Sequence, residues 1–363
     1  MSGTTKLALA LALGLVGSLF VPLGGSTGQA GERRYGYRVL APISRGNLTV
    51  FPVVADFSHD TRNFQTLDEG LRSGEVVVTE AGRIQPLVRG PRRGIPQGGA
   101  EVNRLVLVNN SNRPLILLAG EIVTGGKQDR VIGKDRIVPA QSDPIDLSVF
   151  CVEPGRWVEK ASTFGSFGVQ MAQPSVRASA MVNRDQQKVW SEVHVAAGAM
   201  GQSVGGPAAA PGIDSTSSYA GVMSNKAVAQ KVESVAAPIA RSYEGLLKEL
   251  RSRNAVGVVV AVDGQIIWAD LFASTSLLEK YWPKLIRSYA AEAITRGGIS
   301  SYPDVRAAQA FLDDLEGRRE TVESEPGVYR RTEVAGDGFT AFQLTALLPG
   351  TGFDIHLAKT TQQ

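Results

Sequence analysis

Residues 115–157 read LILLAGEIVTGGKQDRVIGKDRIVPAQSDPIDLSVFCVEPGRW, and this stretch decides the fold expected for the chain. Short runs of Leu, Ile and Val alternate with glycines, a pattern typical of β-strands and tight turns. Polar clusters interrupt these runs at 120–130 and at 151–157. Strands usually end in bland turn residues, so carboxylates, cations, an amide and an indole at strand ends indicate a pocket for a polar ligand, provided that the clusters meet.

The surrounding residues 35–161 are expected to form a β-rich, sandwich-like part. One short helix is predicted at 67–72, because Thr66 and Glu69 have capping-box spacing and Gly74 lies just past its end. Strands are predicted at 48–54, 75–79, 105–109, 114–118 and 145–152.

The second part, residues 162–254, is expected to be helical. Helical spacing at 175–195 and 224–253 flanks the segment 198–221, which is dense in Gly, Ala, Pro and Ser and is predicted to be a flexible loop.

The last part, residues 255–363, is expected to be α+β. Asp263-Gly264 predicts a hairpin between strands at 256–262 and 266–271. A helix is predicted to start at the capping-box pair Ser276 and Glu279 and to end at Gly297. A further helix is predicted at 303–317, and strands at 329–334, 340–347 and 353–357. The predicted fold class of the whole chain is therefore α+β.

Bulk composition limits the functional classes. The chain has 363 residues, of which 43% are hydrophobic and 20% charged, which is typical of a folded protein rather than a disordered one. The net charge is +3, from 38 basic and 35 acidic residues. This balance does not favour a basic nucleic-acid-binding face, so no nucleic-acid partner is expected.

The amino terminus, residues 1–30, is similar to an export signal. Lys6 precedes an apolar run at 7–23, and Gly28-Gln29-Ala30 fits a small-x-small cleavage site. We expect an exported protein, periplasmic or extracellular, with membrane attachment only if this segment stays uncleaved.

The turn at Gly125-Gly126-Lys127 does not fit a nucleotide-binding P-loop. Glu121 replaces the first glycine of G-x-x-x-x-G-K-[ST], and Gln128 replaces the hydroxyl residue. Backbone N–H groups of the glycine turn, beside cationic side chains, can still hold an anion. The alternative is a tight hairpin whose charges are simply solvated.

The second cluster contains Glu153, Arg156 and Trp157. Arginine can grip a carboxylate or phosphate with two parallel hydrogen bonds, and tryptophan can stack on a flat ring or a sugar face. The alternative is a surface Glu–Arg pair worth about 1 kcal/mol or less. Glu121 and Glu153 are the candidate catalytic acid and base, if they lie a few ångströms apart.

Metal binding is not predicted. The three histidines, His59, His194 and His356, are far apart in the sequence, and no His-x-x-x-His or Cys-x-x-Cys pair occurs. No cofactor is predicted either. Cys151 is the single cysteine, so no intramolecular disulfide can form, and we expect it to be a small buried apolar residue.

The paired motifs Gly-Glu…Gly-Gly-Lys-Gln-Asp-Arg (120–130) and Cys-Val-Glu-Pro-Gly-Arg-Trp (151–157) resemble the ARG and Rhodanese-Phosphatase-superfamily-associated protein domain family, where ARG means ADP-ribosylglycohydrolase. The similarity extends over about residues 35–300, with segment 198–221 resembling an insertion. It implies a role near the chemistry of ADP-ribose or nucleotide derivatives, by analogy rather than by a site argument.

We therefore weigh two hypotheses. The first is an exported domain that binds an anionic small molecule, such as an ADP-ribose or nucleotide derivative. The second is an envelope structural or protein-interaction domain without catalytic activity, in which Glu121–Arg130 or Glu153–Arg156 are buried ion pairs. The residues expected to bind a ligand are Glu121, Gly125, Gly126, Lys127, Gln128, Arg130, Glu153, Arg156 and Trp157.

Overall fold

The computed structural model describes residues 36–82, 101–166, 170–249, 253–298 and 303–362. The expected export signal at 1–30 lies outside these residues. Tyr35–Gln363 form one compact unit that mixes helices with antiparallel sheets, which confirms the α+β class. No helix in the described ranges is long and apolar enough to cross a membrane.

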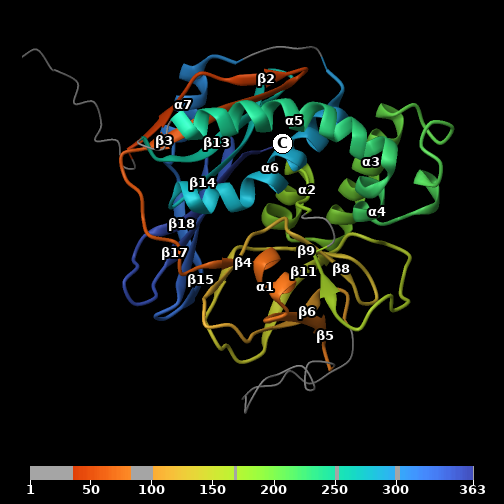
Figure 1. Cartoon of the computed structure of the whole chain (residues 1–363), viewed down its shortest axis with the longest axis horizontal. Helices are drawn as coiled ribbons and strands as arrows, with labels where there is room; N and C mark the ends of the chain where they lie inside the picture. Colours follow the sequence, from red (N-terminus) through yellow and green to blue (C-terminus); the bar gives the residue numbers. More distant parts are fainter. Residues whose placement is uncertain (1–35, 83–100, 167–169, 250–252, 299–302, 363) are drawn as a thin grey trace, which may run out of the picture. The chain divides into compact units, whose positions relative to one another are not determined.

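A nine-stranded antiparallel sheet joins the two ends of this unit (Figure 1). The strand order is β1-β3-β13-β14-β18-β17-β16-β15, and β2 pairs with β3. Because β3 pairs with β13, strands predicted in the first part complete the sheet of the last part. The strands are β1 (Tyr37–Val39), β2 (Ile43–Arg45), β3 (Leu48–Ala55), β13 (Ala255–Val262), β14 (Gln265–Phe272), β15 (Arg318–Glu325), β16 (Tyr329–Gly336), β17 (Phe339–Ala346) and β18 (Asp354–Thr361).

Both faces of the central strands in this sheet are covered. Val258 and Val260 of β13 pack into the core shared with α5 (Lys226–Glu249) and α6 (Thr275–Arg296). Val259, which points to the opposite face, packs in the core shared with α7 (Val305–Asp313). Burial on both faces explains why β13 reads as a continuous apolar run.

Residues 65–82 and 101–165 form the sandwich-like part. A six-stranded sheet, β12-β8-β9-β11-β6-β5, and a three-stranded sheet, β10-β7-β4, share one apolar core with the helix α1 (Leu67–Ser73). The strands are β4 (Gln65–Thr66), β5 (Val76–Glu80), β6 (Arg104–Asn109), β7 (Leu115–Leu117), β8 (Ile122–Gly125), β9 (Arg130–Ile132), β10 (Arg136–Val138), β11 (Ile145–Cys151) and β12 (Phe164–Gly165).

Capping chemistry explains most helix ends. The predicted capping box of α1 is present, with both the Thr66 and the Glu69 hydrogen bonds formed, and Gly74 is left-handed at the C-cap. The start predicted for α6 at Ser276 is wrong, because Ser274 is the N-cap and accepts the N–H of Leu277. Ser276 Oγ instead lies 3.1 Å from Ser274 Oγ.

The single helix predicted at 175–195 is also wrong. The chain forms α2 (Pro174–Ala178), a π-helical turn η2 (Ser179–Asn183) and then α3 (Gln186–Ser203). Arg184 adopts a left-handed φ of 53°, which interrupts the helix, and Asp185 caps α3.

The segment 198–221 is not a continuous loop. Its first residues belong to α3, and it also contains the 3-10 turn η3 (Ile213–Ser215) and the start of α4 (Tyr219–Ser224).

Seven buried charged residues, here called the junction network, connect the sandwich to the rest of the unit: Asp68, Glu121, Asp135, Arg177, Asp270, Lys284 and His356. Lys284 of α6 donates to Asp68 at 2.5 Å and to Glu121. His356 of β18 lies 2.6 Å from Asp135 through Nδ1. Each of these contacts joins a sandwich residue to a residue of the large sheet or of its covering helix.

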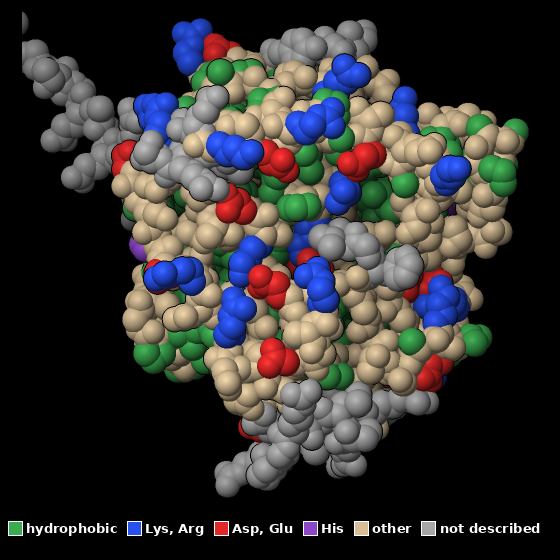
Figure 2. All heavy atoms as spheres, in the orientation of Figure 1, with side chains coloured by type: hydrophobic (Ala, Val, Ile, Leu, Met, Phe, Trp, Pro, Cys, Tyr) green, Lys and Arg blue, Asp and Glu red, His purple; other side chains and the backbone are tan. Residues whose placement is uncertain are grey.

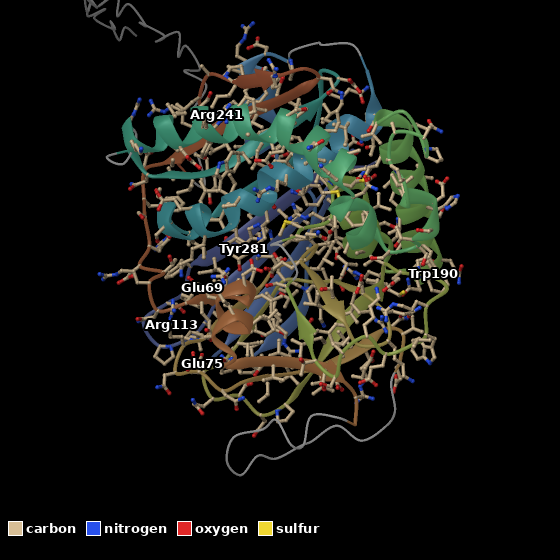
Figure 3. The ribbon with its side chains drawn as sticks, turned by 45° about the vertical axis from the view of Figure 1, so that its right-hand side comes forward. Glu69, Glu75, Arg113, Trp190, Arg241 and Tyr281 are labelled. Carbon is tan, nitrogen blue, oxygen red and sulfur yellow. The ribbon has the colours of Figure 1, made fainter. Side chains whose placement is uncertain are left out.

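The remaining bonds of the junction network anchor Asp270 of β14. Arg177 of α2 donates to it through two nitrogens at 2.8 and 2.9 Å, and Tyr289 donates its hydroxyl. His356 Nε2 lies 3.2 Å from the same carboxylate. Nearby, the hydroxyl of Tyr281 donates to the carbonyl of Ile116 at 3.3 Å, where α6 approaches the sandwich (Figure 3).

The pKa shifts of the junction network follow from burial and pairing. Burial alone would lower the pKa of His356, but Asp135 and Asp270 outweigh it and raise the pKa to about 9. Burial would raise the pKa of Asp270, yet Arg177 and His356 hold it well below its usual range. The imidazole is therefore charged at neutral pH and contributes to folding stability.

Replacing Lys284 with Met should destabilise the fold by about 3–5 kcal/mol, because two buried carboxylates lose their cation. The matched control is Lys280→Met on the same helix. Lys280 binds Glu69 at 2.9 Å with a 28% exposed side chain, so its loss should cost about 1 kcal/mol or less. Urea denaturation measures both, and equal costs would contradict a structural role for the junction network.

The pH dependence of stability should reveal His356. Its pKa is near 6.5 in the unfolded chain and about 9 in the folded protein, so its stabilisation is complete below pH 6.5 and is lost as the pH rises through 9. The difference corresponds to about 3 kcal/mol. Relative to His356→Asn, the wild type should lose this advantage between those pH values in urea denaturation; a constant difference would refute the assignment.

His59→Asn is the control for that titration. His59 stacks on Phe353 at 4.1 Å, and burial lowers its pKa. The His59→Asn variant should therefore lose as much stability between pH 6.5 and 9 as the wild type does.

Candidate functional site

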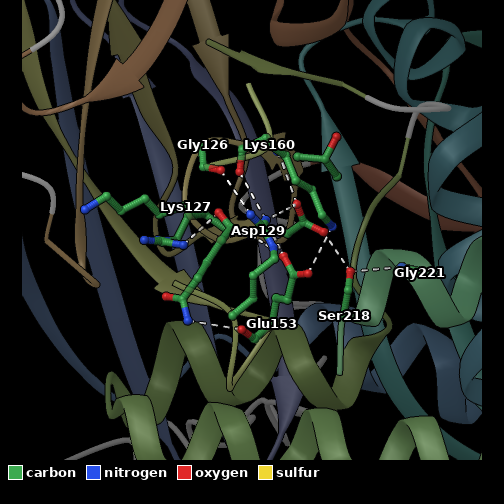
Figure 4. Close-up of polar contacts among 12 residues, drawn as sticks. Gly126, Lys127, Asp129, Glu153, Lys160, Ser218 and Gly221 are labelled. Atoms are coloured by element: carbon green, nitrogen blue, oxygen red, sulfur yellow. Dashed lines mark hydrogen bonds and ion pairs between the residues drawn. The ribbon is translucent and has the colours of Figure 1, made fainter. Parts of the chain in front are cut away.

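The two polar motifs meet in space, as the first hypothesis requires. The N–H of Asp129 donates to Glu153 at 3.0 Å, and the Gln128 amide donates to the Glu153 carbonyl at 3.1 Å (Figure 4). We call the joined residues the motif cluster: Gly125, Gly126, Lys127, Gln128, Asp129, Arg130, Glu153, Arg156, Trp157 and Lys160.

Arg156 holds the motif cluster together. Its guanidinium donates to the carbonyls of Gly126 and Gly125 at 3.0 and 3.3 Å, and to Glu153 at 2.5 Å. It also lies 3.5 Å from Asp129. The Glu153–Arg156 ion pair of the second hypothesis is thus present. Most donors of Arg156 face protein acceptors, so its main contribution is to fix the turn.

Arg130 is completely buried in β9. It donates to the carbonyl of Gln128 at 2.7 Å and lies 3.9 Å from Glu80. Burial lowers its pKa. The predicted Glu121–Arg130 pair is wrong, because Glu80 is the carboxylate beside Arg130.

Lys127 and Trp157 form a cation–π contact on the surface. The ammonium nitrogen lies 4.9 Å from the centre of the ring, and Trp157 is 43% exposed. The N–H of Lys127 donates to Glu80 at 2.9 Å, which orders the turn. Gln128 is buried, and its Oε1 has no hydrogen-bonding partner among the described residues.

Gly126 cannot be replaced without disturbing the turn. Its φ is +46°, and a Cβ atom there would lie 2.2 Å from the ring of Phe164. Gly125 adjoins it at the end of β8, and its N–H donates to Asp129 at 3.1 Å. The glycine pair thus lets β12 cross close to the turn.

Glu121 lies apart from the motif cluster. Its Oε2 accepts the N–H of Leu118 at 2.7 Å, and its Oε1 binds Lys284 in the junction network. Burial raises its pKa, against the attraction of Lys284. Glu121 and Glu153 therefore have separate partners, and these contacts do not support an acid–base pair between them.

A cavity of about 720 Å³ opens beside the motif cluster, between β8, β12 and α4; we call it the motif cavity. Asp129 lines it and accepts the Ser218 hydroxyl at 2.6 Å. Burial raises the pKa of this carboxyl. Lys160 lines it too, with a side chain that is 55% exposed and 3.0 Å from Glu153.

Sequence reasoning passed over three residues that connect the cluster to this cavity: Asp129, Lys160 and Ser218. Asp129 lies inside the first motif, but the ligand-binding role was assigned to its neighbours Lys127, Gln128 and Arg130. Lys160 follows Arg156 by four residues, but its loop carries no motif. Ser218 lies in the small-residue segment 198–221 and had no local signal.

Three further features give no sign of a reactive thiol, a metal site or a charged surface in the described residues. Cys151 is buried, as predicted, and burial raises the pKa of its thiol. Within the described ranges, no group of three or more His, Cys, Asp or Glu is placed to hold a metal ion. On the face in Figure 2, Lys and Arg lie among Asp and Glu, and neither sign forms a continuous patch.

Arg156→Ala should lower the melting temperature and cost about 2–4 kcal/mol, because buried Glu153 and two backbone carbonyls each lose one of their donors. The control is Arg62→Ala, which removes an exposed Arg62–Asp60 pair and should leave the melting temperature unchanged. Thermal unfolding followed by circular dichroism measures both. An unchanged melting temperature for Arg156→Ala would show that the hydrogen bonds of Arg156 do not stabilise the fold.

Comparison with known proteins identifies a family for the chain. Neither the comparison with curated proteins nor that with solved structures returns a match. The family model described as ARG and Rhodanese-Phosphatase-superfamily-associated Protein domain matches residues 36–359. This match spans nearly the whole compact unit, so the chain belongs to the ARG and Rhodanese-Phosphatase-superfamily-associated Protein domain family.

Proposed function

We propose that this protein binds a small molecule that carries both an anionic group and hydroxyls, in the motif cavity. The observation that carries the proposal is the position of this cavity directly against the joined motifs, with Gly125, Asp129 and Lys160 in its wall. Its volume of about 720 Å³ lies within the range usual for small-molecule sites.

Lys160 supplies the charge that selects an anion. It is the only Lys or Arg among the described residues that line the motif cavity, and its half-exposed ammonium can reach a ligand. Lys127 sits over Trp157, while Arg130 and Arg156 are committed to protein acceptors. The anion-binding role expected of those three residues therefore passes to Lys160.

The rest of the wall suits a hydroxylated ligand. Asp129 can accept a hydroxyl hydrogen bond, and side-chain hydroxyls can both donate and accept. The hydroxyl residues of the wall are Thr124, Thr163, Ser166, Thr216, Ser218 and Ser224. Phosphorylated sugars and nucleotide derivatives such as ADP-ribose combine these two properties, and the name of the family points to the same chemistry.

We also propose that the protein acts outside the cytoplasm. The support is the composition of residues 1–30, in which Lys6 precedes an apolar run and small residues. An exported binding domain would meet sugar phosphates or nucleotide fragments in the envelope or the medium.

The second candidate function is protein interaction. It is favoured by the exposure of Trp157 (43%) and Val158 (72%), two large apolar residues adjacent in sequence. Exposed aromatic residues of this kind are enriched at protein–protein contacts. In this case the motif cluster would mainly present Trp157 to a partner.

Lys160→Ala should weaken binding of ADP-ribose or ribose 5-phosphate about tenfold or more, because a charge-assisted hydrogen bond is lost. The matched control is Lys127→Ala, which removes the other surface ammonium of the motif cluster and should leave affinity within about twofold. Isothermal titration calorimetry of the chain without residues 1–30 measures both. Adenosine, which is neutral, should bind more weakly than either anion.

Equal loss in both lysine variants would place the anion elsewhere in the motif cluster. No heat with ADP-ribose, ribose 5-phosphate or inorganic phosphate would contradict the binding proposal. In that event Trp157→Ala, tested by crosslinking for loss of a protein partner, examines the second candidate.

A further inference from the structure

A second cavity lies beside α3 and is lined by none of the residues of the motif cluster. Its volume is about 540 Å³, and residues of α2, η2, α3, β17 and β18 line it. We call it the π-turn cavity, after the π-helical turn η2 that forms one wall. It shares no lining residue with the motif cavity.

Ser179 is the unusual group in this wall. Ser179 is only 5% exposed, and its hydroxyl has no hydrogen-bonding partner among the described residues. Buried hydroxyls are nearly always paired, because an unpaired one has lost its hydration without compensation. A ligand in the cavity that Ser179 lines would supply the partner.

The backbone around Ser179 is also unusual. A π-helical turn replaces the regular helix from Ser179 to Asn183, and Arg184 follows in the left-handed region with φ 53°. Turns of this kind are rare and occur frequently at functional sites. Here the turn faces a cavity rather than solvent alone.

The turn is anchored at both ends, which gives the cavity wall a fixed shape. Before it, the buried Arg177 of α2 donates to Asp270 of β14 at 2.8 and 2.9 Å. After it, Arg184 donates to the carbonyl of Met181 at 3.1 Å and forms an ion pair with Glu333. Rigid walls lower the ordering cost of binding.

The opposite wall presents hydroxyls from the large sheet. Thr340 of β17 and Thr360 of β18 are directly paired in the sheet register, so both side chains lie on the same face. Both are at least 96% buried and both line the cavity. Ser175 and Ser191 add hydroxyls from the helices.

The charge of the wall is balanced. Lys188 and Glu192, one turn apart on α3, are the only charged residues among those that line the cavity in the described ranges. Asn183 and Gln362 contribute amides, which donate and accept as hydroxyls do. A wall without net charge and with many such groups favours a neutral ligand over an anion.

We propose that the π-turn cavity is a second binding site, for a neutral polyhydroxylated small molecule such as a monosaccharide or a cyclic polyol. The ligand would accept or donate a hydrogen bond at the Ser179 hydroxyl, and the Thr340 hydroxyl would meet its other side. The Thr360 hydroxyl already donates to the carbonyls of Ile267 and Thr361 at 3.4 and 3.2 Å, so it would act toward the ligand as an acceptor. Val182, which is 37% exposed at the rim, provides an apolar surface for the carbon skeleton.

The test is isothermal titration calorimetry of the chain without residues 1–30, with D-glucose and with myo-inositol up to tens of millimolar. Wild type should bind at least one of them, and Ser179→Ala should weaken that binding about fivefold or more, since one buried hydrogen bond is lost. The melting temperature of Ser179→Ala without ligand should stay the same or rise, because the hydroxyl has no partner to lose.

Two controls and one further test variant separate this site from others. Ser234→Ala removes a helical serine whose hydroxyl donates to the Lys231 carbonyl on α5, and it should bind as the wild type does. Lys160→Ala should also keep full affinity for the neutral ligand, whatever its effect on anions. Thr340→Val, which keeps the side-chain shape, should weaken binding and replaces Ser179→Ala if that variant does not fold.

The proposal fails if the wild type binds neither neutral ligand, or if Ser179→Ala and Thr340→Val both bind as the wild type does. It also fails if glucose 6-phosphate binds at this site more tightly than glucose, as judged by sensitivity to Ser179→Ala. A loss of neutral binding in Lys160→Ala would move the site to the motif cavity and would equally overturn the assignment.

Discussion

The junction network is the constraint on which the rest of the structure depends. Four carboxylates and three cations are buried where the sandwich-like part meets the large sheet and its helices. Removing such charges from water costs several kcal/mol for each ion, and only good geometry in both partners offsets that cost. A displaced sandwich would leave Lys284 without its two carboxylates and His356 without Asp135. The network therefore selects one packing arrangement, even where apolar surfaces alone would tolerate several.

The segment Leu118–Glu121 shows how sequence and network are matched. The N–H of Leu118 donates to Glu121, and the N–H of Ala119 donates to Asp135 at 2.7 Å. Gly120 has φ +95°, and a Cβ atom there would lie 2.5 Å from the side chain of Arg177. Three consecutive backbone positions thus accommodate the buried ions, so the Gly-Glu pair of the motif is a structural element.

The downstream motifs divide structural and binding roles among similar side chains. Arg130 and Arg156 satisfy carbonyls and carboxylates inside the protein, whereas Lys160 keeps a half-exposed ammonium beside a cavity. An arginine clamp can fix a glycine turn because its planar fork reaches several acceptors at once. A lysine at the rim remains able to exchange its partner for a ligand. The proposed anion site thus combines a buried arginine scaffold with one exposed lysine.

The two cavities differ in the chemistry of their walls. The motif cavity has a lysine beside carboxylate and hydroxyl groups, and the π-turn cavity has paired threonines, amides and the unpaired hydroxyl of Ser179. Helix α3 contributes Lys188 and Glu192 to the second cavity, and its N-cap Asp185 follows directly after the π-helical turn and Arg184. The π-helical turn that replaces the predicted single helix therefore forms one wall of this cavity.

The sequence by itself determined the local elements and the family. Periodicity and caps predicted the α+β class, β3, β11, α1 and the Asp263-Gly264 hairpin, because these depend on neighbouring residues alone. The edge strand β15 was missed, since its run RRETVESE lacks an apolar pattern and its residues are mostly exposed. The paired motifs indicated a shared pocket only if they met, and the contacts of Gln128 and Asp129 with Glu153 come from the structure.

Tertiary structure alone decided which charges are buried and which are available. Glu121 and Arg130 stand in one motif, yet one pairs with Lys284, 163 residues away, and the other lies beside Glu80. Ser218 reaches Asp129 across 89 residues. Such pairings depend on how sheets and helices pack, and the local spacing of residues in the sequence does not predict them. For the same reason, the sequence could not predict that the Ser179 hydroxyl has no partner among the described residues, or that strands β17 and β18 lie across the cavity from it.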